Sequence, residues 1–161
     1  TGKTLLAQRL LERHGAPYLS IDHLKMGLIR SGMCPLTPES TDEALTAVLW
    51  PVVREIVKTA VENGQSLTVE GYYIPFNWRE DFDASCLPHI RFLCLVFSEA
   101  YIRTRFDTIQ THANAIERRK DDSFCTMELL LAENRRNLEA CRRRGLPYYL
   151  IDGPYAPPLD W

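Results

Sequence analysis

The sequence has no excess of positive charge and no long apolar run, and both absences narrow the classes of function. Its 161 residues include 19 Lys and Arg against 21 Asp and Glu, a formal net charge of -2 at pH 7. Such a chain lacks the global basic field that attracts nucleic acid, so no nucleic-acid partner is expected. The longest apolar runs are far shorter than a bilayer requires, so no membrane partner is expected either.

The cysteines also lack the patterns of a metal site or of a disulfide framework. The chain has five cysteines and four histidines, with no CxxC pair and no metal-ligand spacing between the two residue types. Reduced thiols that pack as small apolar groups are the simplest interpretation, and they predict a cytoplasmic protein. The cysteines are Cys34, Cys86, Cys94, Cys125 and Cys141.

The composition is that of a globular domain in which helices and strands alternate. Hydrophobic residues make up 45% and charged residues 25%, enough for a real core within one domain. The alternation predicts an α/β fold with a mainly parallel sheet. Pro51 predicts a kink or break near Trp50 in the longest helix. Helices are predicted at residues 4–14, 23–31, 41–63, from 98 through 106 and at 126–144, and strands at 17–22, 65–70, 89–97 and 147–151.

The first motif, Thr1-Gly2-Lys3-Thr4, leads directly into the first predicted helix. It matches the second half of the phosphate loop G-x-x-x-x-G-K-[ST]. A helix N-terminus presents N–H groups and a partial positive charge to phosphate oxygens. Gly2 would let the backbone approach closely, Lys3 would reach the β- and γ-phosphates, and the Thr4 hydroxyl would ligate Mg²⁺. An ordinary N-terminal helix start is the alternative.

Two carboxylates stand at the ends of predicted strands. Asp22 ends the segment PYLSID, and Glu70 ends LTVE just before Gly71, which permits a sharp turn. Ligands of open α/β sheets bind beyond the carboxyl ends of the strands. Asp22 would accept a proton from an acceptor hydroxyl or hold a Mg²⁺-bound water, and Glu70 would support the Mg²⁺ shell. The alternatives are a helix N-cap at Asp22 and a simple turn acid at Glu70.

Basic residues on both sides of a polar segment predict a lid. A kinase of this size needs cations that close over the transferring phosphoryl group and exclude water. A solvated charged face is the alternative for each of them. The lid residues would be Arg103, Arg105, Arg118, Arg119 and Lys120.

Other residues are candidates for contact with the acceptor. Any of four basic side chains would suit an anionic acceptor, although each taken singly fits a surface position. A run of aromatic side chains after Gly71 would form a pocket wall or, alternatively, pack in the core. The basic candidates are Lys25, Arg30, Arg54 and Arg79, and the aromatic ones are Tyr72, Tyr73, Phe76 and Trp78.

Together these segments resemble a known group of small bacterial P-loop kinases. The similarity lies in GKT, YLSIDHLKMGLIRSG, LWPVVREIVKTAVENGQSLTVEGYYIPF and ERRKDDS, and it extends from Thr1 to about Asp152. Members of the group are labelled 2-phosphoglycerate kinase-like or adenylate-kinase-like. They are similar to the wider nucleoside and nucleotide kinase superfamily, which includes zeta toxins and chloramphenicol phosphotransferases.

The resemblance implies a fold, two cofactors and a set of site residues. The fold would be a single domain over residues 1–161, with three layers, a core of five parallel strands and a short helical lid at about 103–125. The cofactors would be ATP and Mg²⁺. Phosphate and Mg²⁺ would lie at Gly2, Lys3 and Thr4, the base would be Asp22, the acidic residue of the third strand Glu70, the lid arginines Arg103, Arg105, Arg118 and Arg119, and the adenine contacts Asp152 and Gly153.

The family's first strand and the first half of its phosphate loop would precede Thr1. We therefore expect the chain as given to be truncated at its N-terminus and to bind ATP weakly. The predicted function is ATP-dependent phosphoryl transfer to a hydroxyl or phosphate of a small metabolite or nucleotide, by a monomer or weak dimer. The alternatives are an ATP-binding module without catalysis and a toxin-type kinase that acts on a sugar-nucleotide.

Overall fold

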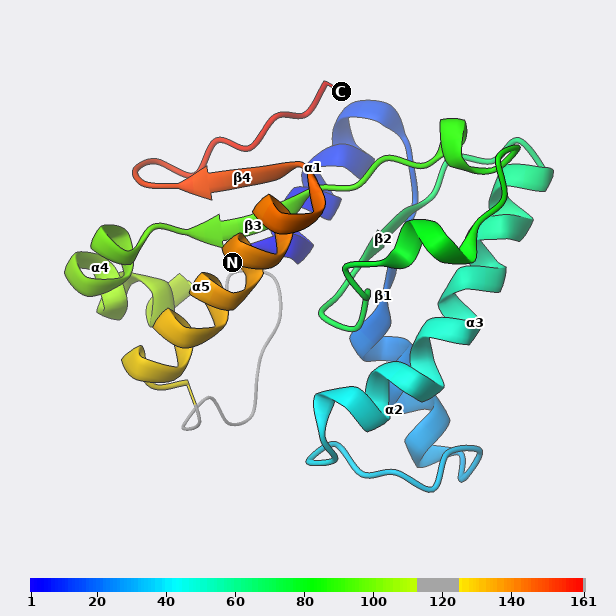
Figure 1. Cartoon of the computed structure of the whole chain (residues 1–161), viewed down its shortest axis with the longest axis horizontal. Helices are drawn as coiled ribbons and strands as arrows, with labels where there is room; N and C mark the ends of the chain where they lie inside the picture. Colours follow the sequence, from blue (N-terminus) through cyan, green and yellow to red (C-terminus); the bar gives the residue numbers. More distant parts are fainter. Residues whose placement is uncertain (113–124, 161) are drawn as a thin grey trace. The chain divides into compact units, whose positions relative to one another are not determined.

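The structure is a computed structural model that describes residues 1–112 and 125–160. The chain forms two compact units (Figure 1), and each is described by itself. One unit contains residues 7–91, and the other, called here the 92–160 unit, also includes Thr1–Leu6. Helix α1 (Lys3–His14) begins in the second unit and continues into the first. Within the described ranges, every helix is too short or too polar to cross a bilayer.

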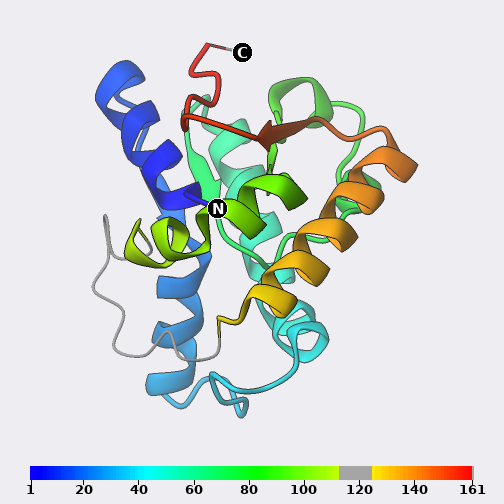
Figure 2. The ribbon, with the colours of Figure 1, turned by 90° about the vertical axis from the view of Figure 1, so that its left-hand side faces the viewer.

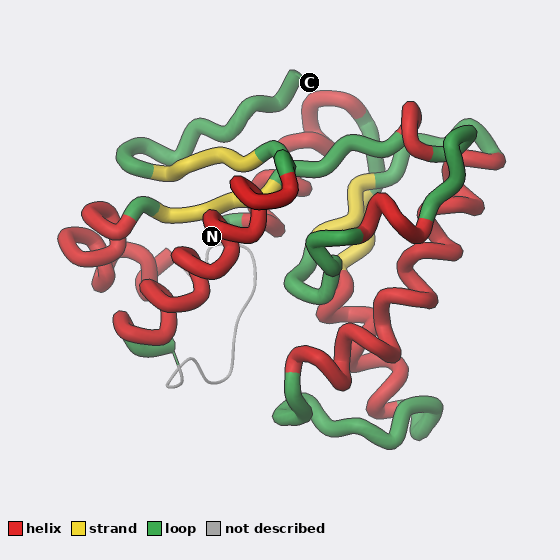
Figure 3. The backbone as a smooth tube through the Cα atoms, in the orientation of Figure 1, coloured by secondary structure: helices red, strands yellow, loops and turns green. Residues whose placement is uncertain are grey.

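The 7–91 unit is built around one pair of parallel strands. Strand β1 runs beside β2 with Ser20 opposite Glu70 at the carboxyl end, and two helices form the crossover that parallel pairing requires (Figures 1 and 3). Both strands are shorter than the sequence predicted. The elements are β1 (Tyr18–Ser20), α2 (Ile21–Arg30), α3 (Asp42–Glu62) and β2 (Thr68–Glu70).

Helix α3 runs through Pro51 as one helix, so of the two outcomes predicted near Trp50 the break is wrong. The Thr41 side chain caps the start of the helix by accepting a hydrogen bond of 3.3 Å from the Ala44 N–H. Pro51 removes the N–H that would bond to the Ala47 carbonyl. Both residues are exposed, so water can solvate that carbonyl and the helix continues.

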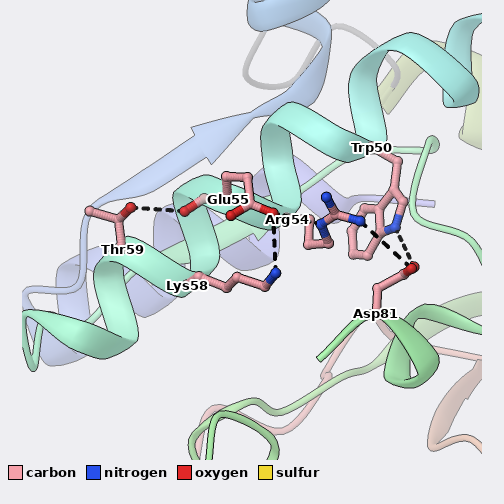
Figure 4. Close-up of polar contacts among 6 residues, drawn as sticks. All are labelled: Trp50, Arg54, Glu55, Lys58, Thr59 and Asp81. Atoms are coloured by element: carbon pink, nitrogen blue, oxygen red, sulfur yellow. Dashed lines mark hydrogen bonds and ion pairs between the residues drawn. The ribbon is translucent and has the colours of Figure 1, made fainter. Parts of the chain in front are cut away.

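The aromatic segment after β2 is fixed to α3 by a partly buried polar contact (Figure 4). The Trp50 indole N–H donates to Asp81 Oδ2 over 2.8 Å, and Arg54 Nη1 lies 3.8 Å from Asp81 Oδ1. The Phe82 ring packs edge-on against the rings of Trp50 and Trp78. Trp78 therefore belongs to the core, one of the two roles the sequence left open. Two short 3-10 helices lie in this segment, at Trp78–Asp81 and Leu87–His89.

The 92–160 unit repeats the same plan with a second parallel pair. Strands β3 and β4 pair from Cys94 opposite Tyr148 to Phe97 opposite Ile151, with α4 and α5 alongside (Figures 1 and 2). The predicted strand at 89–97 begins only at Cys94, because residues 87–89 form a 3-10 turn. The elements are β3 (Cys94–Phe97), α4 (Glu99–His112), α5 (Met127–Arg144) and β4 (Tyr148–Ile151).

A buried asparagine caps the last N–H on the edge of β3 that faces away from β4. The N–H groups of Cys94 and Ser98 bond to the β4 side, and alternate residues of a parallel strand point to opposite edges. The Phe97 N–H therefore points to the other edge, where it donates to Asn134 Oδ1 over 2.8 Å. The Asn134 amide in turn donates to the Leu130 carbonyl over 2.7 Å, so both ends of this buried side chain are hydrogen-bonded.

The five cysteines are free thiols, as predicted. Burial raises the pKa of Cys94 to about 12, with the neighbouring Cys141 thiol as a second cause. Burial likewise raises the pKa of Cys141. Because only a thiolate is strongly nucleophilic, neither residue suits covalent catalysis.

Each unit combines helices with a small parallel sheet. The predicted α/β class is confirmed to this extent: helices and strands are mixed, and the observed strand pairs are parallel. Each sheet contains two strands. A two-stranded sheet is marginal by itself, so most of the stability must come from helices packed on it and from side-chain contacts such as the one at Asp81.

Replacing Asp81 by alanine should destabilise the protein by about 1–3 kcal/mol, because the buried Trp50 N–H would lose its acceptor. Urea denaturation followed by tryptophan fluorescence measures the change. Glu55→Ala is the matched control on the same helix, since the exposed Glu55 carboxylate bonds to Arg54 and Lys58, and it should change stability less. Equal midpoints for Asp81→Ala and the parent protein would contradict the role of this contact.

Candidate functional site

The phosphate-loop residues lie at the first turn of α1, where the sequence predicted them. Gly2 has a φ of +76°, a conformation that favours glycine, and its carbonyl accepts the helical hydrogen bond from the Leu6 N–H over 3.0 Å. Lys3 and Thr4 follow as the first two helical residues, and both are partly exposed. This is the backbone geometry of a helix N-terminus that can receive an anion.

Gly2 has a second, purely structural reason to be glycine. The Tyr155 hydroxyl donates to the Gly2 carbonyl over 2.6 Å. A Cβ atom at position 2 would lie 2.8 Å from Cε2 of the Tyr155 ring. The glycine is therefore required whether or not phosphate binds, and Lys3 and Thr4 are the residues that point to phosphate chemistry. No local pattern in the sequence points to this role of Tyr155.

The proposed adenine contact Asp152 is tied to the start of α4. The Ser98 hydroxyl donates to the Asp152 carboxylate and accepts from the Tyr101 N–H over 3.0 Å. The pair links the ends of β3 and β4, while Gly153, the next residue, has open space where a side chain would stand. A role for Asp152 and Gly153 beside adenine stays a prediction.

Only part of the predicted lid falls within the described residues. Arg103 forms an ion pair of 2.8 Å with Glu99, to which Arg135 also donates over 3.2 Å. Hydrogen bonds from these two arginines lower the pKa of Glu99. Arg105 lies at a kink in α4, with φ −130° and ψ 22°. Arg118, Arg119 and Lys120 lie outside the described residues, so the lid itself stays a prediction.

The carboxyl end of the β1–β2 pair carries the two predicted acids in different settings. β1 ends at Ser20, so Asp22 stands in the first turn of α2 and not at the strand end. Ser20 is the N-cap of α2, so the N-cap alternative for Asp22 is wrong as well. The Asp22 side chain is 48% exposed, whereas Glu70 is only 7% exposed.

Two buried polar atoms at this strand end lack a partner in the part of the chain that the structure describes. They are Ser20 Oγ and Glu70 Oε1, which belong to paired residues of the two strands. Burying an oxygen without a hydrogen bond is costly, so both atoms suit a cation or a water that the site would receive. Mg²⁺ binds through one or two carboxylates together with waters and substrate phosphates. The donor set at Glu70 therefore fits Mg²⁺, although the described residues contain no cluster of three or more acidic, His or Cys side chains.

Lys25 is the basic residue beside Asp22. Its Nζ lies 3.3 Å from Asp22 Oδ1 and donates to the Tyr73 hydroxyl over 3.1 Å. Burial by itself would lower the pKa of Lys25, but the hydrogen bond to Tyr73 and the charge of Asp22 together raise it. Lys25 is therefore an ammonium at neutral pH, held in a polar triad of Asp22, Lys25 and Tyr73.

The other three basic candidates are used elsewhere or lie on the surface. Arg54 pairs with Glu55 at 2.8 Å and with Asp81. Arg79 is exposed, with its guanidinium 5.4 Å from the Trp78 ring centroid. Arg30 is exposed in the last turn of α2. Of the four basic candidates, Lys25 is thus the one that the structure joins to a predicted catalytic residue.

Gly71 holds the two strand ends of the site together. A Cβ atom at this position would lie 2.6 Å from Ile21 Cβ, a distance that real Cβ atoms do not adopt. Ile21 immediately precedes Asp22, and Gly71 immediately follows Glu70. The close approach of Gly71 to Ile21 therefore sets how the triad and the buried carboxylate are arranged.

Comparison with known proteins does not place the chain in a family. No family model, curated protein or solved structure matches it. Its function therefore has to be inferred from the chain's own residues and their surroundings. Within the 7–91 unit these are the triad, Ser20 and Glu70, and within the 92–160 unit they are Gly2, Lys3 and Thr4.

Gly71→Ala should destabilise the protein by about 1–3 kcal/mol, because the new methyl group overlaps the Ile21 side chain. Gly27→Ala is the matched control: Gly27 is exposed inside α2 with nothing within 4 Å of the added atom. It should stabilise the protein by about 0.5–1 kcal/mol through helix propensity. Thermal unfolding followed by circular dichroism compares the two variants, and a melting temperature for Gly71→Ala at or above that of the parent would disprove the contact.

Proposed function

We propose that this chain is an ATP-dependent phosphotransferase of the P-loop type, which transfers a phosphoryl group to the hydroxyl of a small metabolite. The observation that carries the proposal is the position of Lys3 and Thr4 in the first turn of α1, directly after a glycine with positive φ. A lysine and a hydroxyl at a helix N-terminus are the groups that a phosphate loop uses for phosphate and Mg²⁺. The polar triad and Glu70 add the groups that an acceptor and a metal need.

The proposal includes the finer fold, a three-layer P-loop domain with a further parallel strand leading into Gly2. Each observed pair of strands supports it, because each has an edge at which another strand can add. In the β1–β2 pair, the Thr68 N–H bonds toward β1. The backbone N–H and carbonyl of the next residue, Val69, therefore point to the edge of β2 that faces away from β1. In the β3–β4 pair, the Cys94 N–H bonds toward β4. The backbone N–H and carbonyl of the next residue, Leu95, therefore point to the opposite edge of β3.

Each site residue has a defined part in the proposed reaction. When bound, MgATP would supply the phosphoryl group, and ADP would leave with the electron pair of the broken P–O bond. In the 92–160 unit, Lys3 would bind phosphate oxygens and Thr4 would be the hydroxyl ligand of Mg²⁺, and in the 7–91 unit Glu70 would be the carboxylate that supports a Mg²⁺ shell. Asp22, whose carboxylate is half-exposed and therefore reachable, would take the proton of the acceptor hydroxyl as the acceptor oxygen forms the new P–O bond.

Lys3→Ala should lower the turnover of ATP by about 100-fold or more, since it removes a charge that stabilises the transferring phosphoryl group. ADP release by the full-length protein with a panel of hydroxylated acceptors measures this loss, and a thermal shift with MgATP measures binding. Gln8→Ala is the control on the same helix, where the Gln8 amide donates to Glu12 over 2.9 Å. Unchanged phosphoryl transfer by Lys3→Ala would refute the proposed function.

Asp22→Asn should lower kcat by about 100-fold while leaving the thermal shift with MgATP intact, because the amide cannot accept the acceptor's proton. The two measurements also separate a kinase from an ATP-binding module without catalysis. A stabilising thermal shift without ADP release from any acceptor in the parent protein would favour the module. Full activity of Asp22→Asn would remove Asp22 from the catalytic role.

A further inference from the structure

We propose that Lys25 and Tyr73 form an anion-binding subsite, which selects acceptors that carry a carboxylate or a phosphate near the hydroxyl to be phosphorylated. The inference rests on the proposed function, since it names the class of acceptor for the same site. It comes from the triad itself: the Lys25 ammonium bonds to a carboxylate on one side and to a phenol on the other.

Each of the two side chains keeps one unused donor. An ammonium has three N–H bonds, of which Asp22 and Tyr73 engage two. The Tyr73 oxygen accepts from Lys25, so its own O–H hydrogen remains available to donate. Among the described residues, neither Lys25 nor Tyr73 has a further hydrogen-bond partner. Two donors therefore lie about one hydrogen bond apart, a spacing that suits two oxygens of one carboxylate or phosphate.

The burial of the two donors points to a ligand. The Lys25 side chain is 15% exposed and Tyr73 is 7% exposed, whereas the carboxylate that faces Lys25 is 48% exposed. A largely buried ammonium is stabilised by each close partner, and Asp22 and Tyr73 leave its third N–H for another acceptor. An anion from the acceptor would complete the pairing with charge-assisted hydrogen bonds.

The proton transfer at Asp22 would strengthen this binding during the reaction. Before transfer, Lys25 divides its charge between Asp22 and the acceptor anion. Once Asp22 accepts the hydroxyl proton it becomes neutral, and the ammonium then pairs with the anion alone. A group that binds more tightly as the reaction proceeds raises kcat as well as affinity, so Lys25 would act on both parameters for charged acceptors.

Lys58 provides a matched control for Lys25 within the same unit. It pairs with Glu55 at 3.1 Å with the same i, i+3 spacing as Lys25 with Asp22. Its side chain is also partly buried, but it lies on α3 and its ion-pair partner Glu55 is not a predicted site residue. If activity falls merely because a partly buried ion pair is removed, the fall will therefore appear in Lys58→Met as well as in Lys25→Met.

Anion binding tests the subsite without catalysis. Inorganic phosphate and acetate are titrated separately by calorimetry into Lys3→Ala protein, in which phosphate cannot use the lysine of the phosphate loop. We expect Lys25→Met or Tyr73→Phe in this background to weaken binding of the preferred anion by about 10- to 100-fold, the effect of a hydrogen bond to a charged group. Lys58→Met should change nothing. Equal affinity in Lys25→Met and its parent for both anions would overturn the proposal.

Acceptor kinetics test the selectivity. ADP release is measured with glycerate and glycerol 3-phosphate as charged acceptors and with glycerol as the neutral one. Lys25→Met should lower kcat/KM about 10- to 100-fold more for the charged acceptors than for glycerol, and Lys25→Arg should recover part of that difference. Tyr73→Phe keeps the ring and its packing against Tyr72, so it tests the subsite should Lys25→Met fail to fold.

The two proposals fail in different ways. Anion binding that depends on Lys25, without ADP release from any acceptor, would refute the phosphotransferase and keep the subsite. ADP release with the same ratio of charged to neutral acceptors in Lys25→Met and in the parent would refute the subsite and keep the phosphotransferase. A parallel loss for all acceptors in Lys25→Met and in Lys58→Met would reduce the triad to a structural bridge and overturn the subsite.

Discussion

Gly71 has no side chain, and this allows the backbone that leaves β2 to pack directly on Ile21, the residue that follows β1. The polar groups of the 7–91 unit depend on that approach. Ile21 is fully buried and leads into α2, so its position fixes the first turn that carries Asp22. On the other strand the chain can turn sharply after Glu70 and bring Tyr73 to the Lys25 ammonium. A contact between two apolar groups thus determines where the charged ones meet.

The sequence predicted the elements well because their ends carry local signals. Thr41 and Thr126 cap their helices, and Gly145 ends α5 with a φ of +61°. The errors occur where the surroundings in the folded chain, and not the local sequence, determine whether a helix or strand continues. Pro51 did not end α3, because the carbonyl of Ala47, which loses its N–H donor, belongs to an exposed residue that water can reach. β1 stopped at Ser20, two residues before the predicted end, because the first helical turn begins at Ile21.

The site was predicted in part for the same reason. Gly2, Lys3 and Thr4 form a contiguous motif, and Asp22 and Glu70 each end an apolar segment, so local patterns made them candidates. The pairing of Lys25 with Tyr73 spans 48 residues, and that of Tyr155 with Gly2 spans 153. No periodicity within one helix or strand encodes such contacts. Among four basic candidates, the sequence could not single out Lys25, because the distinction lies in what the folded chain places around it.

The two acids of the 7–91 unit occupy opposite environments, and this argues for a division of roles. Glu70 is buried, and one of its oxygens has no partner in the described chain, so a metal ion or an ordered water would relieve the cost of its burial. Asp22 is half-exposed and lies beside an ammonium, so an acceptor hydroxyl can reach it while Lys25 balances its charge. Environments that differ in this way separate a metal-binding carboxylate from a proton-accepting one. A chain in which both acids were simple turn residues would have no reason to bury one of them without a partner.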